Sequence, residues 1–265
     1  MKVFLFDAAR CNGCHNCQVA CKDEHCGNDW MPYAAPQPDT GHFWMQVQEI
    51  EHGQAPKVRL EYRACMCNHC DDAACIKAAP DCVYRRDDGL VIIDPEKAKG
   101  RRDIVESCPH GRIFWNDELA LPQKCTGCAH LIDAGQVPHC VDLCATGALR
   151  FGDESDFSDE ISSGKAVAVD AGGGRVYCMN MPKLFVAGEV WDPFDDEIIE
   201  GACVHLVGEG VDRSELTDGF GDFWFKGLEP GNYQLEVSVS NYLGQSKQFR
   251  LDKSLNLGDF PLRRA

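Results

Sequence analysis

The stretch "CNGCHNCQVAC", from Cys11 to Cys21, holds four cysteines within eleven residues. In its C-x2-C-x2-C-x3-C spacing, three close thiolates bind one [4Fe–4S] cluster and the fourth binds a neighbouring cluster. A structural zinc site needs only two C-x2-C pairs, so the denser spacing favours iron–sulfur. Because the fourth thiolate serves another cluster, the motif predicts a partner motif elsewhere in the chain.

The stretch "KCTGCAHLIDAGQVPHCVDLC", from Lys124 to Cys144, is that partner. It retains the closing C-x3-C spacing and carries an insertion between its second and third cysteines. Exchange of the fourth ligands between the two motifs predicts two clusters. The first set is Cys11, Cys14, Cys17 and Cys144, and the second set is Cys125, Cys128, Cys140 and Cys21.

A third motif, "CNHCDDAAC", supplies three ligands, and its expected fourth position holds Ala79. The same spacing laid backward from Cys108 reaches three positions that also lack cysteine. The third set, Cys67, Cys70, Cys75 and Cys108, is therefore complete. The other set that these two motifs would form lacks cysteine at all four positions. We call these positions the vacated set: Ala79, Ala98, Arg101 and Ile104. Loss of one whole ligand set predicts three [4Fe–4S] clusters on twelve cysteines.

Composition narrows the class of protein. The 265 residues suggest about two domains. A net charge of −16 argues against nucleic acid and against anionic membrane surfaces as partners. No apolar run approaches the ~18 residues of a membrane span, so we expect no direct membrane insertion. The N-terminus lacks signal-peptide features, which predicts a cytoplasmic protein, or one exported with a partner that carries a twin-arginine signal.

The chain has seventeen cysteines, an odd number that cannot all pair in disulfides. Together with the missing secretion signal, this number argues against a disulfide-rich protein. Five cysteines lie outside the three sets, and we expect each to be a small buried hydrophobic residue. They are Cys26, Cys65, Cys82, Cys178 and Cys203.

The chain changes character along its length. Short strand-like stretches adjoin the cysteine motifs, as in "KVFLFD" and "ALRFGD", whereas residues 183–265 hold alternating strands such as "YQLEVSVS". The pattern predicts an α+β protein. A tandem ferredoxin-like [4Fe–4S] domain would occupy residues 1–182, and an all-β sandwich residues 183–265.

Polar residues near the motifs have simpler interpretations than catalysis. His15, His69, His110 and His130 should be exposed or hydrogen-bonded, because every predicted cluster already has four thiolates. Arg101 fills the vacated space or reaches solvent; alternatively, its charge raises the potential of the remaining cluster. No combination of residues in the sequence matches a catalytic site better than chance, so we predict no catalytic residue in this chain.

Several stretches resemble the iron–sulfur electron-transfer subunits of the molybdopterin oxidoreductase family, which includes the dimethyl-sulfoxide and respiratory nitrate reductases. They are "CNGCHNCQVAC", "CNHCDDAAC", "DGLVIIDPEKAKG", "CPHG" and "QKCTGCAHLIDAG". The stretches "DEHCGNDW" and "GHFWMQV" resemble the polyphenol branch of that family, the transhydroxylases and catechol dehydroxylases. Residues from about 183 onward resemble transthyretin-like or collagen-adhesin-type modules.

The resemblance implies a non-catalytic subunit with three clusters, which forms a heterodimer or higher oligomer with a large catalytic subunit. That partner would hold molybdopterin guanine dinucleotide with molybdenum or tungsten. The first set would lie nearest the partner, and the vacated set at the outer end of the relay. Two alternatives stay open: a subunit of an oxoanion reductase, and a stand-alone ferredoxin-like carrier or interaction protein.

Overall fold

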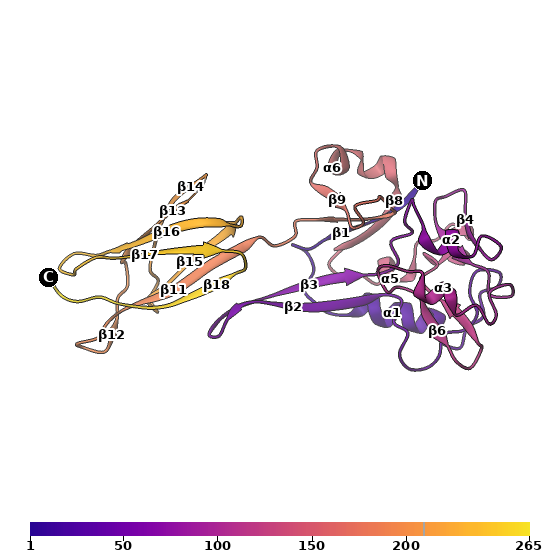
Figure 1. The fold of residues 1–265 in the computed structure, drawn as a ribbon, viewed down its shortest axis with the longest axis horizontal. Helices are drawn as coiled ribbons and strands as arrows, with labels where there is room; N and C mark the ends of the chain where they lie inside the picture. The colour runs from indigo at the N-terminus through magenta and orange to yellow at the C-terminus, as the bar shows by residue number, and fades with distance from the viewer. Residues whose placement is uncertain (209) are drawn as a thin grey trace. The chain divides into compact units, whose positions relative to one another are not determined.

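The computed structural model describes residues 1–208 and 210–265 (Figure 1). The chain forms two compact units. The first, here called the cysteine unit, comprises Met1–Glu49 and Tyr62–Met181; the second, the β unit, comprises Ile50–Glu61 and Pro182–Ala265. The division into two domains at residues 1–182 and 183–265 stays a prediction. The sequence did not indicate that residues 50–61 belong with the β unit.

A four-stranded sheet forms the base of the cysteine unit. Its strand order is β8 (Leu149–Asp153), β1 (Lys2–Asp7), β10 (Val176–Met179) and β9 (Ala166–Ala168). Strand β1 runs antiparallel to β8 and parallel to β10. The stretches "KVFLFD" and "ALRFGD" thus form strands, as their patterns predict.

Strand β1 is buried on both faces. Phe4 and Phe6 pack into the apolar core that contains several of the cysteines, whereas Val3 and Leu5 face a smaller core around Phe157. This alternation follows from the period-two geometry of a strand. The central strand therefore anchors the first cysteine motif, which begins four residues after β1 ends.

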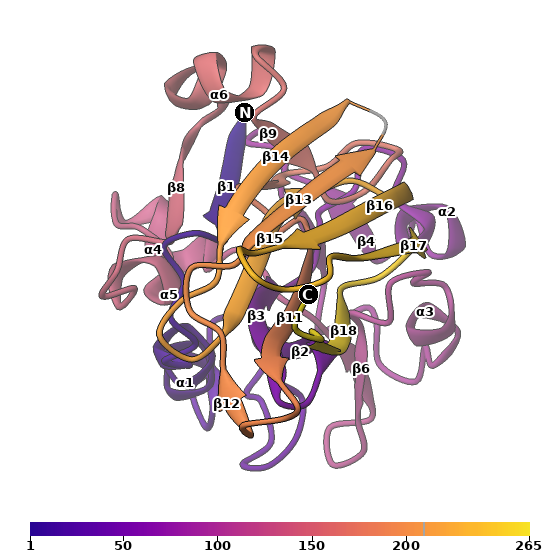
Figure 2. The ribbon, with the colours of Figure 1, turned by 90° about the vertical axis from the view of Figure 1, so that its left-hand side faces the viewer.

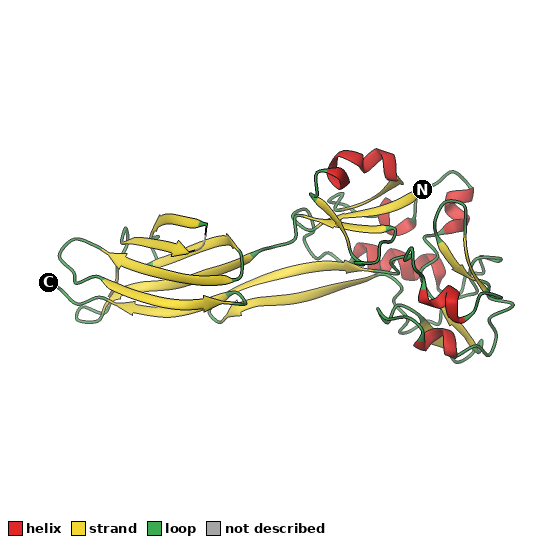
Figure 3. Cartoon of the chain, turned by 45° about the horizontal axis from the view of Figure 1, so that its top comes forward, coloured by secondary structure: helices red, strands yellow, loops and turns green. Residues whose placement is uncertain are grey.

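Short helices and two-stranded hairpins carry the rest of the cysteine unit (Figure 3). The helices are α1 (Asn16–His25), α2 (Ala74–Ala78), α3 (Asp103–Glu106), α4 (Ala129–Asp133), α5 (His139–Asp142), η1 (Glu154–Phe157) and α6 (Ser158–Ser162). The hairpins pair β4 (Val83–Arg85) with β5 (Val91–Ile93) and β6 (Phe114–Asn116) with β7 (Leu121–Gln123).

The β unit is a sandwich of two sheets (Figure 2). One sheet contains β12 (Glu197–Ile198), β11 (Leu184–Asp192), β15 (Asp222–Leu228) and β18 (Leu255–Pro261). The other contains β14 (Val211–Leu216), β13 (Cys203–Gly208), β16 (Gly231–Ser238) and β17 (Gln245–Leu251). Tyr233, Leu235 and Val237 of β16 are buried between the sheets, as their alternation predicts.

The hairpin of β2 (Gln46–Gln54) and β3 (Lys57–Cys65) contributes its outer residues to the β unit. The Lys57 ammonium forms an ion pair with Asp222 in which both side chains are largely buried. The Oε1 atom of Gln54 accepts a 2.7 Å hydrogen bond from the N–H of Asn256. These contacts tie residues 50–61 to strands β15 and β18.

Candidate iron–sulfur centres

The three C-x2-C loops share one backbone feature. The residue before the second cysteine is left-handed in each loop, with φ 71° at Gly13, 45° at His69 and 67° at Gly127. This turn directs backbone N–H groups toward the sulfur of the first cysteine. The N–H of Gly127 lies 3.3 Å from Cys125 Sγ, and that of His69 lies 3.5 Å from Cys67 Sγ.

The structure brings the first cysteine set together. Burial, followed by repulsion from Cys144 and Cys11, raises the pKa of Cys17 to about 11. Burial also raises the pKa of Cys11, with added repulsion from Cys14 and Cys144. The N–H of Leu149 donates to Cys144 Sγ at 3.3 Å. Cys14 is exposed, so this set reaches the surface of the cysteine unit.

The second set is buried throughout. Helix α1 packs against helix α5, which places Cys21 beside the cysteines of the last motif. Burial, then repulsion from Cys125 and Cys128, raises the pKa of Cys21 well above its ordinary value. Burial likewise raises the pKa of Cys140, with repulsion from Cys128 and Cys21. Cys21 therefore neighbours the distant motif, and its role as the fourth ligand of that motif's cluster stays a prediction.

The third set lines one cavity, and all four of its cysteines contribute. The cavity and the solvent at its mouth together have about 370 Å³ of empty volume. Burial raises the pKa of Cys75, Lys124 opposes that increase, and repulsion from Cys67 and Cys108 adds to it. The N–H of Arg112 donates to Cys108 Sγ at 3.3 Å.

Two polar side chains flank Cys70 at the edge of this cavity. His110 Nε2 lies 2.9 Å from an Asp170 carboxylate oxygen, and the ligand atoms of these residues and Cys70 lie within 4.8 Å of one another. Burial, then a hydrogen bond with Asp170, raises the pKa of Cys70 to about 12. His110 is thus hydrogen-bonded, as expected, and its partner is a carboxylate.

The sets form a row. Cys67 of the third set raises the pKa of Cys125 in the second, after the larger effect of burial. Cys17 of the first set contributes in the same way to the raised pKa of Cys140 in the second. The second set therefore lies between the other two.

The donor chemistry fits [4Fe–4S] clusters. All seventeen cysteines lie among the described residues, and none of them forms a disulfide bond. The raised pKa values mean that the buried thiols hold their protons unless a cationic site stabilises the thiolates, which iron supplies. The N–H groups directed at sulfur are the donors that stabilise cluster ligands. Four sulfurs in each set leave no place for a fifth protein ligand.

Apolar packing fills the vacated set. Ala79, Ala98 and Ile104 have no accessible surface. They belong to an apolar plug that consists of Ala73, Ala79, Cys82, Val83, Val91, Ile93, Ala98, Ile104 and Ile113. Cys70, Cys75 and Cys108 pack against this plug. The third set is therefore bordered by hydrophobic side chains on the side where a fourth set would lie.

Arg101, the remaining vacated position, turns outward. Its guanidinium forms ion pairs with Asp81 at 3.2 Å and Asp103 at 2.8 Å. Of its predicted roles, the structure favours the one in which the side chain reaches solvent. Two carboxylates offset its charge, which weakens the alternative that Arg101 raises a cluster potential.

Four of the five remaining cysteines are more exposed than expected. Cys82 is buried in the apolar plug, as predicted, but Cys26, Cys65, Cys178 and Cys203 are only partly buried. Polar partners explain two of these exceptions, because a thiol is a weak hydrogen-bond donor. Cys26 Sγ lies 3.4 Å from an Asp39 carboxylate oxygen, and Cys65 Sγ lies 3.3 Å from the Gln48 amide oxygen.

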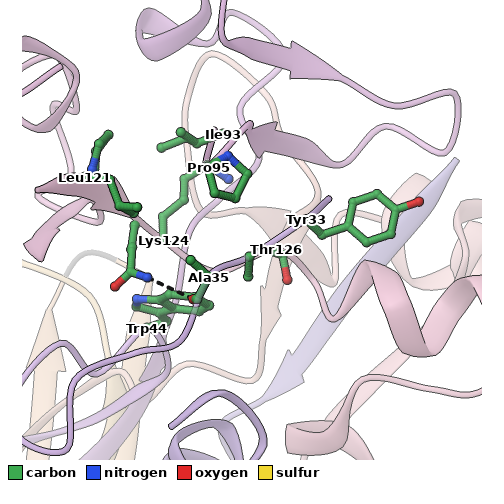
Figure 4. Close-up of a pocket in the computed structure, with 11 residues that line it drawn as sticks. Tyr33, Ala35, Trp44, Ile93, Pro95, Leu121, Lys124 and Thr126 are labelled. Atoms are coloured by element: carbon green, nitrogen blue, oxygen red, sulfur yellow. Dashed lines mark hydrogen bonds between the residues drawn. The ribbon is translucent and has the colours of Figure 1, made fainter. Parts of the chain in front are cut away.

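A second cavity lies beside the Cys125 loop, and together with the solvent at its mouth it has about 240 Å³ of empty volume (Figure 4). Trp44, Ile93 and Thr126 line it, and none of its lining residues is a cysteine. It is therefore separate from the three predicted sets. Trp44 is buried, so the "GHFWM" stretch contributes its tryptophan to the core.

Comparison with known proteins identifies both parts of the chain. Residues 58–154 match a family described as a 4Fe-4S dicluster domain, and residues 186–263 match the carboxypeptidase regulatory-like domain. The small subunit of pyrogallol hydroxytransferase from Pelobacter acidigallici is 35% identical over 96% of both chains. A polypeptide of anaerobic dimethyl sulfoxide reductase from Escherichia coli is 34% identical over 56% of this chain and 72% of its own length. A subunit of tetrathionate reductase from Salmonella typhimurium is 32% identical over 60% of each.

The matched 4Fe-4S domain and these relatives define the class of protein, an iron–sulfur subunit of redox enzymes. The protein belongs to the family of iron–sulfur subunits of the molybdopterin oxidoreductases, and it is similar over nearly its full length to a pyrogallol hydroxytransferase small subunit. Among the described residues, no helix is long and apolar enough to cross a membrane.

Proposed function

We propose that the chain carries three [4Fe–4S] clusters, one on each cysteine set, and conducts electrons to and from a large molybdopterin subunit. The observation that carries the proposal is the grouping of twelve cysteines into three neighbouring sets beside a vacated set filled with apolar side chains. Each cluster, when bound, accepts and releases one electron. The chain supplies the thiolates, the N–H donors and the exclusion of water.

We infer that the large subunit holds molybdopterin guanine dinucleotide with molybdenum or tungsten, and that it acts on a polyphenol. The near full-length similarity to a pyrogallol hydroxytransferase small subunit supports this substrate class. Within that class, the first candidate is a transhydroxylase of the pyrogallol–phloroglucinol type, and a catechol dehydroxylase is the alternative. The second candidate is an oxoanion reductase, which the similarity to dimethyl sulfoxide and tetrathionate reductase subunits supports. This similarity covers only 56–60% of this chain.

Cys14 is the exposed member of the first set, so the first set is the end of the row that we expect to face the large subunit. A relay hands electrons across an interface most readily where a cluster is close to the surface. The β unit takes no catalytic role in this scheme, and its likeness to transthyretin-like or collagen-adhesin-type modules stays a prediction. The cytoplasmic location, with export beside a twin-arginine partner as the alternative, stays a prediction too.

Anaerobic purification under near-native conditions tests the proposal. We expect a complex with a molybdenum- or tungsten-bearing large subunit and about twelve irons per copy of this chain, from three clusters of four. A count near sixteen would restore the fourth cluster. A chain that runs alone would support a stand-alone carrier instead. Assays of the complex with pyrogallol, catechols and oxoanions then distinguish the substrate classes.

A further inference from the structure

His69 occupies a backbone position that the sister loops give to glycine. Its φ of 45° lies in the left-handed region, where Gly13 and Gly127 lie in the other two C-x2-C loops. Residues with a Cβ atom seldom adopt this conformation, and a non-glycine residue there signals a requirement for its side chain. A histidine at this position of the third loop therefore needs an explanation that loop geometry does not supply.

The side chain of His69 is completely buried and lines the cavity of the third set. The N–H of Val91 in strand β5 donates a 2.9 Å hydrogen bond to His69 Nδ1. Because a backbone N–H can only donate, Nδ1 is the unprotonated nitrogen. With Nδ1 acting as the acceptor, the imidazole ring of His69 can hold only one proton. Its single ring proton is therefore on Nε2.

This Nε2–H group is a buried donor without an acceptor among the described residues. Buried polar groups are nearly always hydrogen-bonded, so an unpaired donor in a cavity indicates a partner that occupies that cavity. The same proton prevents Nε2 from ligating iron, because a neutral imidazole coordinates through its unprotonated nitrogen. His69 is therefore a donor toward the contents of the cavity and not a ligand.

We propose that His69 Nε2–H donates a hydrogen bond to a sulfur of the cluster held by Cys67, Cys70, Cys75 and Cys108, and thereby raises the reduction potential of that cluster. The proposal rests on the proposed function, which puts a cluster in this cavity. A reduced cluster carries more negative charge than an oxidised one, so a donor to its sulfur stabilises the reduced form more. Gly13 and Gly127 offer no such side chain, so the effect is confined to the third cluster.

Redox titration of the anaerobic complex, followed by electron paramagnetic resonance, tests this positioning role. His69→Gly installs the residue of the sister loops and removes the donor without adding backbone strain. We expect it to lower the ratio of reduced to oxidised third cluster about tenfold at a given potential, which is ~59 mV for one electron. The potentials of the other two clusters should not change. His69→Gln, whose amide N–H can replace Nε2–H, should recover part of the shift.

A matched control is His15→Gly, because His15 is a partly exposed histidine within the first motif, between Cys14 and Cys17, and it pairs with Glu49. It should leave the potential of the third cluster unchanged. Pulsed resonance on complex labelled with ¹⁵N-histidine gives a direct readout: one nitrogen should couple to the reduced third cluster and disappear in His69→Gly. This measurement on the wild-type complex also covers the case in which the glycine variant fails to assemble.

Two outcomes would overturn the proposal: an unchanged third potential in a His69→Gly complex that keeps about twelve irons, or no nitrogen coupling in the wild type. A wild-type complex with about eight irons has a different meaning. It would show that the third cluster is absent, and the proposed function, not the role of His69, would then be wrong.

Discussion

Replacement of Ile104 by alanine should destabilise the cysteine unit without removing iron. Ile104 occupies a vacated position, has no accessible surface and packs in the apolar plug with Ala79 and Ala98. Truncation of a buried isoleucine to alanine costs ~2–5 kcal/mol, because the lost methyl groups leave a cavity. Each kcal/mol shifts the melting temperature of a unit of this size by about 2–4 °C. The expected decrease is therefore roughly 4–20 °C.

Calorimetry of the anaerobic complex at one scan rate measures the apparent melting temperature, and chemical analysis measures iron. Arg101→Ala is the matched control, because Arg101 is also a vacated position but its side chain pairs with carboxylates at the surface. It should cost much less than Ile104→Ala. Equal effects of the two substitutions, or a loss of about four irons in Ile104→Ala, would refute the view that the vacated set is a packed core.

Three further predictions test separate parts of the molecule. Cys21→Ser should remove about four irons and the signal of the Cys125 cluster, with the cluster of the first motif intact; loss of the latter instead would contradict the exchange of ligands. Lys57→Met leaves the buried Asp222 carboxylate unpaired and should destabilise the β unit by about 3–5 kcal/mol in calorimetry; a Lys57→Met/Asp222→Leu double variant should recover most of this loss. Burial opposes ionisation of Asp192, but hydrogen bonds from a backbone N–H, a tyrosine and an arginine lower its pKa below 3.8. Its ionised form therefore contributes stability above that pH, and the contribution is lost as pH falls through the lowered pKa; acid titrations of Asp192→Asn should lack this loss.

Local patterns predicted the strands and the grouping of the cysteines. Ligand spacing within a loop is set by the tight turn around one cluster, so Cys67, Cys70 and Cys75 could be grouped from sequence spacing. Tyr233 and Leu235 could be placed on one face of a strand because alternation is also a local property. Both inferences needed only the order of residues along the chain.

Contacts between distant segments could not be predicted in this way. His69 meets the N–H of Val91, twenty-two residues away, and only the packing of strand β5 beside the third loop brings them together. The spacing "CNHC" gave no sign that its histidine is left-handed or that its proton is on Nε2. The assignment of residues 50–61 to the β unit has the same origin, since a strand pattern does not name the partner against which the strand packs.

The apolar plug explains why all four cysteines of one ligand set are replaced together. Burial raises the pKa of at least one cysteine in each retained set, namely Cys17, Cys140 and Cys75. A set without its iron would therefore leave buried, protonated thiols around an empty space. Such a void is costly in a protein interior, and alanine and isoleucine side chains fill it. Partial loss of the set would leave both a void and unligated thiols, so complete replacement is the stable outcome. On the proposed assignment, the third cluster then borders hydrophobic side chains instead of another cluster. An electron on that cluster would return through the second cluster unless a partner docked near Cys70, and a raised potential from His69 would favour its retention.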